Sequence, residues 1–162
     1  ERLREPDTRA AELDALREAV RHAHSAEARD FRGDNQWVML YGLECYDRWI
    51  ETFRADPPVV PDMGDRYCFN VYRSTHRAAA EFLREIAPKY PQAVSDLGRA
   101  ANCFATEADA LHTCTEWLFP GGELPATADR ATHDRVAHLL SRARDHYARA
   151  ISSIEAALPA ME

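Results

Sequence analysis

The chain has 162 residues and a formal net charge of −7, with 46% hydrophobic and 29% charged residues. This composition is typical of a globular protein rather than a disordered segment, and the length suits one domain with its own core. The acidic balance argues against nucleic acid as a partner, because phosphate backbones need a clustered basic face. No apolar run approaches the roughly 20 residues of a membrane span, so no membrane partner is predicted.

Cysteine placement and the N-terminus indicate where the chain resides. The N-terminus is charged and has no apolar signal segment. The cysteines form no C-x-x-C pair and lie on or beside apolar helical stripes, as reduced core cysteines do: Cys45, Cys68, Cys103 and Cys114. We therefore expect a reducing, cytoplasmic location. Because the chain begins at Glu1 without methionine, we expect residues 1–162 to be a single helical-bundle domain cut from a longer protein.

The first half of the chain predicts two helices. Asp7 and Thr8 are suited to cap a helix at 7–28, and a loop is expected at 29–35. The helix expected at 37–54 has two adjacent apolar stripes, which predicts packing on two sides: Met39, Leu43, Tyr46, Ile50 and Phe53, beside Val38, Tyr41, Cys45 and Trp49. Gly42 within this helix indicates either a close helix crossing or room for a ligand.

Residues 66–118 predict an antiparallel pair of helices after a proline-stiffened connector at 56–65. Pro88 ends the first helix and Pro91 suits the first turn of the second. Their apolar stripes recur every three or four residues: Cys68, Tyr72, Thr75, Ala79, Phe82 and Ile86, then Val94, Leu97, Ala101, Phe104, Ala108, Leu111, Thr115 and Leu118.

The last helix is expected at 127–158, after a break at Phe119-Pro120-Gly121-Gly122. Its stripe is Val136, Leu140, Ala143, Tyr147, Ala150 and Ile154. Five helices with mostly short connections predict an all-α, up-and-down helical bundle of about five helices with shallow crossings of roughly 20°.

Aromatic and polar residues on the inner helices suggest a ligand pocket. Bundle pockets combine aromatic walls with a few polar groups that orient the ligand. The candidate ligand-binding residues lie at the start of the second helix, in the middle of the third and in the middle of the fourth: Trp37, Tyr41 and Glu44, then Tyr72, Arg73 and His76, then Glu107. The competing interpretation is that Tyr and Trp here are core residues whose one polar atom is satisfied.

Metal and catalytic signatures are incomplete. A ferritin-like site needs two Glu-x-x-His motifs, and the chain has only one Asp-x-x-His, formed by Asp109 and His112. In an up-and-down bundle, one end could gather four donors of the kinds that zinc binds: His112, Cys114, His133 and Cys68. No complete nucleophile–base pair is visible, and no cofactor or catalytic residue is predicted.

Two segments resemble a known family. These are residues 41–51, with the pattern G-L-x-x-Y-x-x-W-I-E, and residues 77–85, with the pattern R-x-x-A-x-F-L-x-E. Together they resemble a helical domain of uncharacterised bacterial proteins. In some of those proteins the domain follows a cysteine-protease-like domain like that of butirosin biosynthesis protein H. The resemblance implies an accessory or ligand-binding module and carries over no catalytic residue.

The leading hypothesis is a non-catalytic helical module that binds a small, partly apolar ligand between the second, third and fourth helices. One alternative is a metal-dependent enzyme built on a four-helix bundle, using His112, His133 and Cys114. Another is a dimerisation module, in which the outer stripes of the fourth and fifth helices pack against a second copy to form a homodimer.

Overall fold

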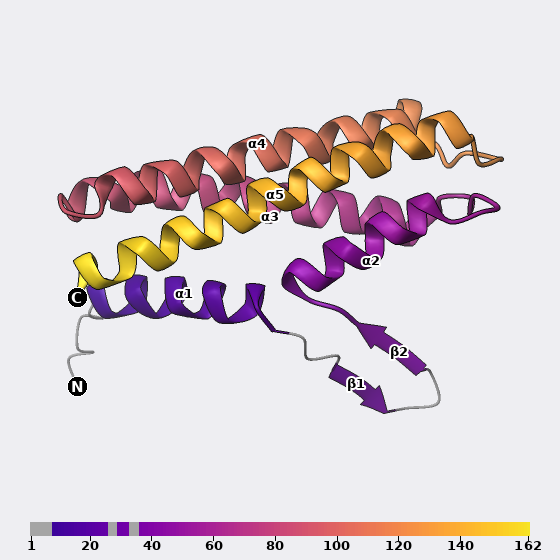
Figure 1. Cartoon of the computed structure of the whole chain (residues 1–162). Helices are drawn as coiled ribbons and strands as arrows, with labels where there is room; N and C mark the ends of the chain where they lie inside the picture. Colours follow the sequence, from indigo (N-terminus) through magenta and orange to yellow (C-terminus); the bar gives the residue numbers. More distant parts are fainter. Residues whose placement is uncertain (1–7, 26–28, 33–35) are drawn as a thin grey trace, which may run out of the picture.

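The computed structural model describes residues 8–25, 29–32 and 36–162, and only the backbone of residues 29–32 and 36–39. Within these ranges the predicted all-α bundle is confirmed (Figure 1). Its helices are α1 (Thr8–Ala23), α2 (Gly42–Arg54), α3 (Met63–Ile86), α4 (Val94–Leu118) and α5 (Arg130–Met161). Two short 3-10 turns, η1 (Ala87–Lys89) and η2 (Pro120–Gly122), lie on either side of α4. None of the described helices is long and apolar enough to cross a membrane.

The two shortest helices share one side of the bundle, where they follow one another along α5 (Figure 1). Near the C-terminus, the turn that follows α1 contacts α5 through His24, whose Nε2 lies 3.0 Å from Glu155 Oε1. Closer to the start of α5, α2 contacts it through Asp47 and Arg144, with an Oδ1–Nε distance of 2.5 Å. The long helices α3, α4 and α5 occupy the other three positions of the bundle.

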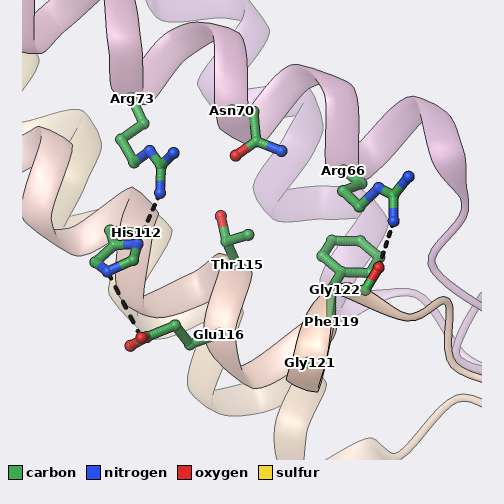
Figure 2. A pocket seen from close by; sticks show the side chains of 9 residues that line it. All are labelled: Arg66, Asn70, Arg73, His112, Thr115, Glu116, Phe119, Gly121 and Gly122. Atoms are coloured by element: carbon green, nitrogen blue, oxygen red, sulfur yellow. Dashed lines mark hydrogen bonds and ion pairs between the residues drawn. The ribbon is translucent and has the colours of Figure 1, made fainter.

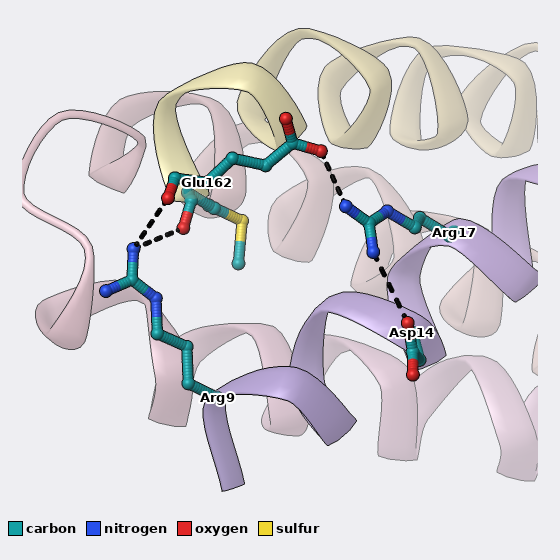
Figure 3. Close-up of polar contacts among 5 residues, drawn as sticks. Arg9, Asp14, Arg17 and Glu162 are labelled. Carbon is teal, nitrogen blue, oxygen red and sulfur yellow. Dashed lines mark hydrogen bonds and ion pairs between the residues drawn. The ribbon is translucent and has the colours of Figure 1, made fainter. Parts of the chain in front are cut away.

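Arginines of α1 hold the end of α5 (Figure 3). Arg9 donates to the carbonyl oxygen of Met161 at 2.6 Å, and Arg17 pairs with the Glu162 carboxylate, also at 2.6 Å. Arg17 reaches back to Asp14 on its own helix at 3.3 Å. Cations near the last carbonyls of a helix also interact favourably with its dipole, so these contacts fix α1 against α5.

A short β-hairpin separates α1 from α2, which corrects two expectations. Strand β1 (Arg29–Arg32) pairs antiparallel with β2 (Gln36–Met39), with Arg29 opposite Met39 and Arg32 opposite Gln36. A loop was expected at 29–35 and a helix from Trp37. The helix starts only at Gly42, whose φ of 56° is incompatible with a helix continuing through it. The run from Trp37 to Met39, rich in strand-forming side chains, pairs as a strand instead.

The core is centred on the α4–α5 interface. Small side chains with no exposure let the two backbones approach closely: Ala100, Ala101 and Ala108 on α4, with Ala143 and Ala150 on α5. Large side chains fill the space on either side, among them Leu97, Leu111, Leu140, Ile151 and Ile154. Each such side chain contributes about 1.5–3 kcal/mol by leaving water. The apolar stripes predicted for these two helices are therefore largely confirmed.

The predicted stripe of α3 is displaced by one residue at several positions, although Ile86 is buried as predicted. Phe69, Ala80 and Leu83 are buried, whereas Cys68 and Thr75 are exposed. The sequence allows either member of the adjacent apolar pairs Cys68–Phe69, Ala79–Ala80 and Phe82–Leu83 to face the core, and in each pair the second member is the more buried. Two aromatic residues of α3 and α4 also lie at the surface: Tyr67 is 69% exposed and Trp117 is 37% exposed.

Helix starts follow side-chain caps. The Asp62 carboxylate accepts from Gly64 N at 2.7 Å, and Asp65 returns a bond to Asp62 N at 3.1 Å, which is a capping box. This cap sets the start of α3 at Met63, three residues before the expected start. Asp129 accepts from Thr132 N at 2.9 Å and sets the start of α5 at Arg130, three residues after the expected one.

A buried carboxylate connects α1 to the α3–α4 turn. Glu12 is 9% exposed; its Oε1 accepts from Lys89 Nζ at 2.5 Å and its Oε2 accepts from Tyr90 OH at 2.7 Å. Both oxygens are therefore satisfied. The hydrogen bond from Lys89, aided by that from Tyr90, lowers the pKa of Glu12 from its ordinary 4.5.

This contact predicts an acid-sensitive contribution to stability. A carboxylate whose folded-state pKa is lowered stabilises the fold above its unfolded-state pKa, and that stabilisation is lost as the pH falls through the folded-state pKa. We expect Glu12→Gln to have a lower free energy of unfolding than the parent near pH 7 and a smaller deficit near pH 3. Urea unfolding at both pH values measures this. An equal deficit at both would contradict the assignment.

Gly42 and Gly98 form a matched pair for substitution. A Cβ at Gly42 would overlap the carbonyl oxygen of Ala23, and its positive φ disfavours other residues. Gly98 lies inside α4 with nothing near the position of a Cβ. We expect Gly42→Ala to destabilise by at least about 1–2 kcal/mol and Gly98→Ala to stabilise by about 0.5–1 kcal/mol. Thermal and urea unfolding test both signs. A tolerated Gly42→Ala would show that α1 and α2 do not meet this closely.

Candidate functional site

Glu107 is a fully buried carboxylate in the middle of α4, inside the bundle. Its Oε1 accepts a short hydrogen bond from Tyr46 OH on α2 and lies 2.7 Å from His76 Nδ1 on α3. An ionised carboxylate only accepts hydrogen bonds, so His76 donates from Nδ1. The other oxygen, Oε2, is buried and has no hydrogen-bond partner in the part of the chain that the structure describes.

Aromatic rings from all four sides of the bundle gather near this carboxylate. Tyr147 on α5 stacks on His76, with ring centroids 5.2 Å apart and an interplanar angle of 15°. Tyr72 on α3 meets Tyr46 edge-on at 6.0 Å. Phe104, one turn before Glu107 on α4, lies 5.3 Å from His76. We call these residues the Glu107 cluster: Tyr46, Tyr72, His76, Phe104, Glu107 and Tyr147.

Burial keeps the phenols of this cluster protonated. It raises the pKa of Tyr46 well above 10, and the negative charge and hydrogen bond of Glu107 raise it further. Burial likewise raises the pKa of Tyr72 and of Tyr147. Tyr72 shares a hydrogen bond with the thiol of Cys45, whose pKa burial also raises. The cluster therefore contains neutral hydroxyl groups around one acidic side chain, with the neutral Cys45 thiol beside it.

The two buried glutamates of the described chain differ in one respect. Glu12 uses both carboxylate oxygens, one with Lys89 and one with Tyr90. Glu107 receives both of its donors on Oε1 and leaves Oε2 without a partner. A buried polar atom without a hydrogen bond costs about 1–3 kcal/mol. Of the two glutamates, Glu107 is therefore the one whose environment leaves an interaction to be made.

The cluster borders a seam between α2 and α3 that consists of side chains. The backbones of these two helices largely stay apart, while α2 packs along α5 and α3 along α4. Rings bridge the gap: Trp49 lies 4.1 Å from Phe69 and 5.9 Å from Tyr72, between centroids. We call this row of ring contacts the α2–α3 seam. From the two stripes predicted for the second helix, Tyr46 and Phe53 contact α5 and Trp49 contacts α3, whereas Val38 and Met39 belong to β2.

Three of the seven predicted ligand-binding residues come together in the Glu107 cluster: Tyr72, His76 and Glu107. Arg73 lies outside the cluster and contacts His112 on the surface, with Arg73 Nη1 2.8 Å from His112 Nδ1. At the start of α2, Glu44 is exposed and Tyr41 packs edge-on against the His22 ring at 5.1 Å. Trp37 belongs to β2, and its side chain lies outside the described residues.

Sequence reasoning missed three members of the cluster, namely Tyr46, Phe104 and Tyr147. All three lie on predicted apolar stripes, where they were interpreted as core. The usable signal was Glu107, a charged residue next to the stripe position Ala108. A carboxylate facing the core needs donors, and tyrosines on the facing stripes of neighbouring helices are the natural ones.

The predicted end-of-bundle metal donors do not form a site. His112 is exposed and contacts Arg73 and Glu116, whereas Cys114 is buried, which raises the pKa of its thiol to about 12. His133 packs against the Phe53 ring at 5.2 Å, and Cys68 is exposed. Among the described residues, no three His, Cys, Asp or Glu side chains are grouped to hold a metal ion.

No family model, curated protein or solved structure matches this chain. The resemblance of residues 41–51 and 77–85 to a bacterial helical domain therefore stays a prediction, as does the homodimer expected from the outer faces of α4 and α5. The fold and the Glu107 cluster are the observations from which function must be argued.

Removing the central carboxylate tests whether the cluster organises the bundle. Glu107→Ala leaves two buried donors without an acceptor, and we expect it to lower the free energy of unfolding by about 3–5 kcal/mol. Glu107→Gln keeps a carbonyl acceptor and should cost clearly less. Asp109→Ala is the control on the same helix, because its pair with Arg77 is exposed and should contribute at most about 1 kcal/mol. Urea unfolding that placed Glu107→Ala within the range of the control would contradict the structure.

Proposed function

We propose that the protein is a non-catalytic helical module that binds a small, partly apolar molecule bearing a protonated amine. The site is the Glu107 cluster, between α2, α3 and α4. The observation that carries this proposal is the Oε2 atom of Glu107, which is buried and has no hydrogen-bond partner among the described residues.

The chemistry of the cluster favours a cation over other ligands. An ammonium group carries three N–H donors, from which a carboxylate oxygen accepts hydrogen bonds, and its positive charge strengthens those bonds. The faces of Tyr46, Tyr72 and Tyr147 attract cations through their ring electrons, and this attraction is larger in a desolvated site. The same rings and Phe104 supply apolar contact for the body of the ligand. An anionic ligand would meet only repulsion from Glu107.

Access through the α2–α3 seam requires side chains to move, not backbones. Tyr72 and Cys45 are partly exposed along this seam, and the side chain of His76 keeps 14% of its surface accessible. Movement of the Tyr72 ring would therefore open a route to Tyr46 and Glu107 while the backbones of α3, α4 and α5 stay packed.

We assign binding rather than catalysis to the cluster because its polar groups are hydrogen-bonded to one another. The Tyr46 hydroxyl and the His76 Nδ1 both contact one carboxylate oxygen. The raised pKa values of the tyrosines keep their hydroxyls protonated near neutral pH. Such groups orient a ligand by hydrogen bonding and are poor nucleophiles.

Binding of a compact apolar amine tests the proposal. A panel of primary amines led by phenethylamine is titrated near pH 7 by calorimetry, beside the neutral analogue 2-phenylethanol. We expect an amine to bind at least about tenfold more tightly than its alcohol analogue, and Glu107→Gln to abolish that preference.

Glu12→Gln is the matched control, since it removes an equal charge from the other buried glutamate, and it should retain the preference. Circular dichroism of each variant confirms that the fold is kept. Equal binding of amine and alcohol by the parent protein would sink the proposal, as would an unchanged preference in Glu107→Gln.

A further inference from the structure

A polar groove of about 560 Å³ runs along the surface between α3 and α4, outside the Glu107 cluster (Figure 2). Its volume falls within the range of small-molecule sites. The walls come from the first half of α3 and the last turns of α4, and η2 closes one end: Arg66, Asn70, Arg73, His112, Thr115, Glu116, Phe119, Gly121 and Gly122.

The α3 wall presents hydrogen-bond donors in a row. Arg66, Asn70 and Arg73 follow one another at spacings of four and three residues, which places them on one face of the helix. Seven residues separate the two arginines, so their backbones lie about 10 Å apart along the axis. Figure 2 shows Arg66 towards the η2 end, Arg73 towards His112 and Asn70 between them.

Both guanidinium groups are held in place by contacts across or beside the groove. Arg66 donates to the carbonyl oxygen of Gly122 and lies 3.0 Å from the Met63 sulfur. Arg73 Nη1 lies 2.8 Å from His112 Nδ1, and His112 Nε2 lies 3.6 Å from Glu116. A guanidinium has five N–H donors, so each arginine keeps donors beyond these contacts while its position is restrained.

The groove carries positive charge on a protein whose net charge is −7. Two arginines line it against one acidic side chain, Glu116, which lies beside His112. The Asn70 amide makes no hydrogen bond to another side chain of the described residues, and the Thr115 hydroxyl donates to Leu111 O at 2.9 Å, which leaves its oxygen lone pairs free to accept. Arginine forks bind carboxylate and phosphate oxygens well because two parallel N–H bonds fit them.

We propose that this groove binds a small molecule with an anionic oxygen group at each end, of the dicarboxylate class. One anionic group pairs with Arg66 and the other with Arg73. Asn70 donates to the middle of the ligand. This site shares no residue with the Glu107 cluster and takes ligands of opposite charge, so the two proposals stand or fall separately.

Linear dicarboxylates from succinate to suberate are the probes, with acetate as the single-charge comparison, titrated at constant ionic strength. We expect one of the dicarboxylates to bind at least about tenfold more tightly than acetate. Arg66→Gln and Arg73→Gln should each reduce that binding to the level of acetate. Arg84→Gln removes the same charge from an exposed position of α3 outside the groove and should leave the affinity unchanged.

Circular dichroism establishes that each variant is folded. Arg73→Lys is a further variant at this position, which keeps the charge but loses the planar fork of the guanidinium. It should bind less tightly than the parent by several-fold. Binding of every dicarboxylate no tighter than acetate would overturn the proposal. A loss in Arg84→Gln as large as in Arg73→Gln would also overturn it, since that result indicates attraction to overall charge.

Discussion

Close packing of α4 against α5 is the constraint on which the rest of the structure depends. Alanines on both helices allow the backbones to approach, and the leucines and isoleucines beside them remove most of the apolar surface from water. The remaining helices attach to this pair: α3 along α4, and α1 and α2 in sequence along α5. Any polar group in the interior must therefore be satisfied across helix interfaces whose spacing is already set.

Glu107 occupies that interior, and its burial has a cost that must be offset. Tyr46 and His76 supply donors from two different helices, so the carboxylate ties α2 and α3 to α4. Buried polar groups of this kind sometimes fix which arrangement of helices forms rather than adding to stability. In this protein the compensation is incomplete at Oε2. Both oxygens of Glu12 are satisfied. This contrast is the reason for assigning Glu107 to ligand binding and Glu12 to structure.

Helix type and number were predictable because three- and four-residue spacing persists over long segments, most clearly in α4. The one-residue error in α3 arose because Cys68–Phe69 and Phe82–Leu83 are adjacent apolar pairs, and spacing alone does not choose between members. The hairpin was missed because the positive φ of Gly42 depends on the approach of Ala23, a tertiary contact. Tyr72, His76 and Glu107 were identified by their chemistry. Tyr46 and Tyr147 were not, because a tyrosine that serves a buried carboxylate looks like a core residue in sequence.

The α2–α3 seam has a consequence for how the native state opens. Elements joined mainly by interdigitated rings separate at a lower free energy than elements whose backbones are closely packed. Opening along the seam therefore separates α2 from α3 while α2 keeps its packing against α5. Amide protons of α2 would then exchange with solvent earlier than those of α4. Such opening would expose the Tyr72 edge of the Glu107 cluster to solvent before any of the long helices separates.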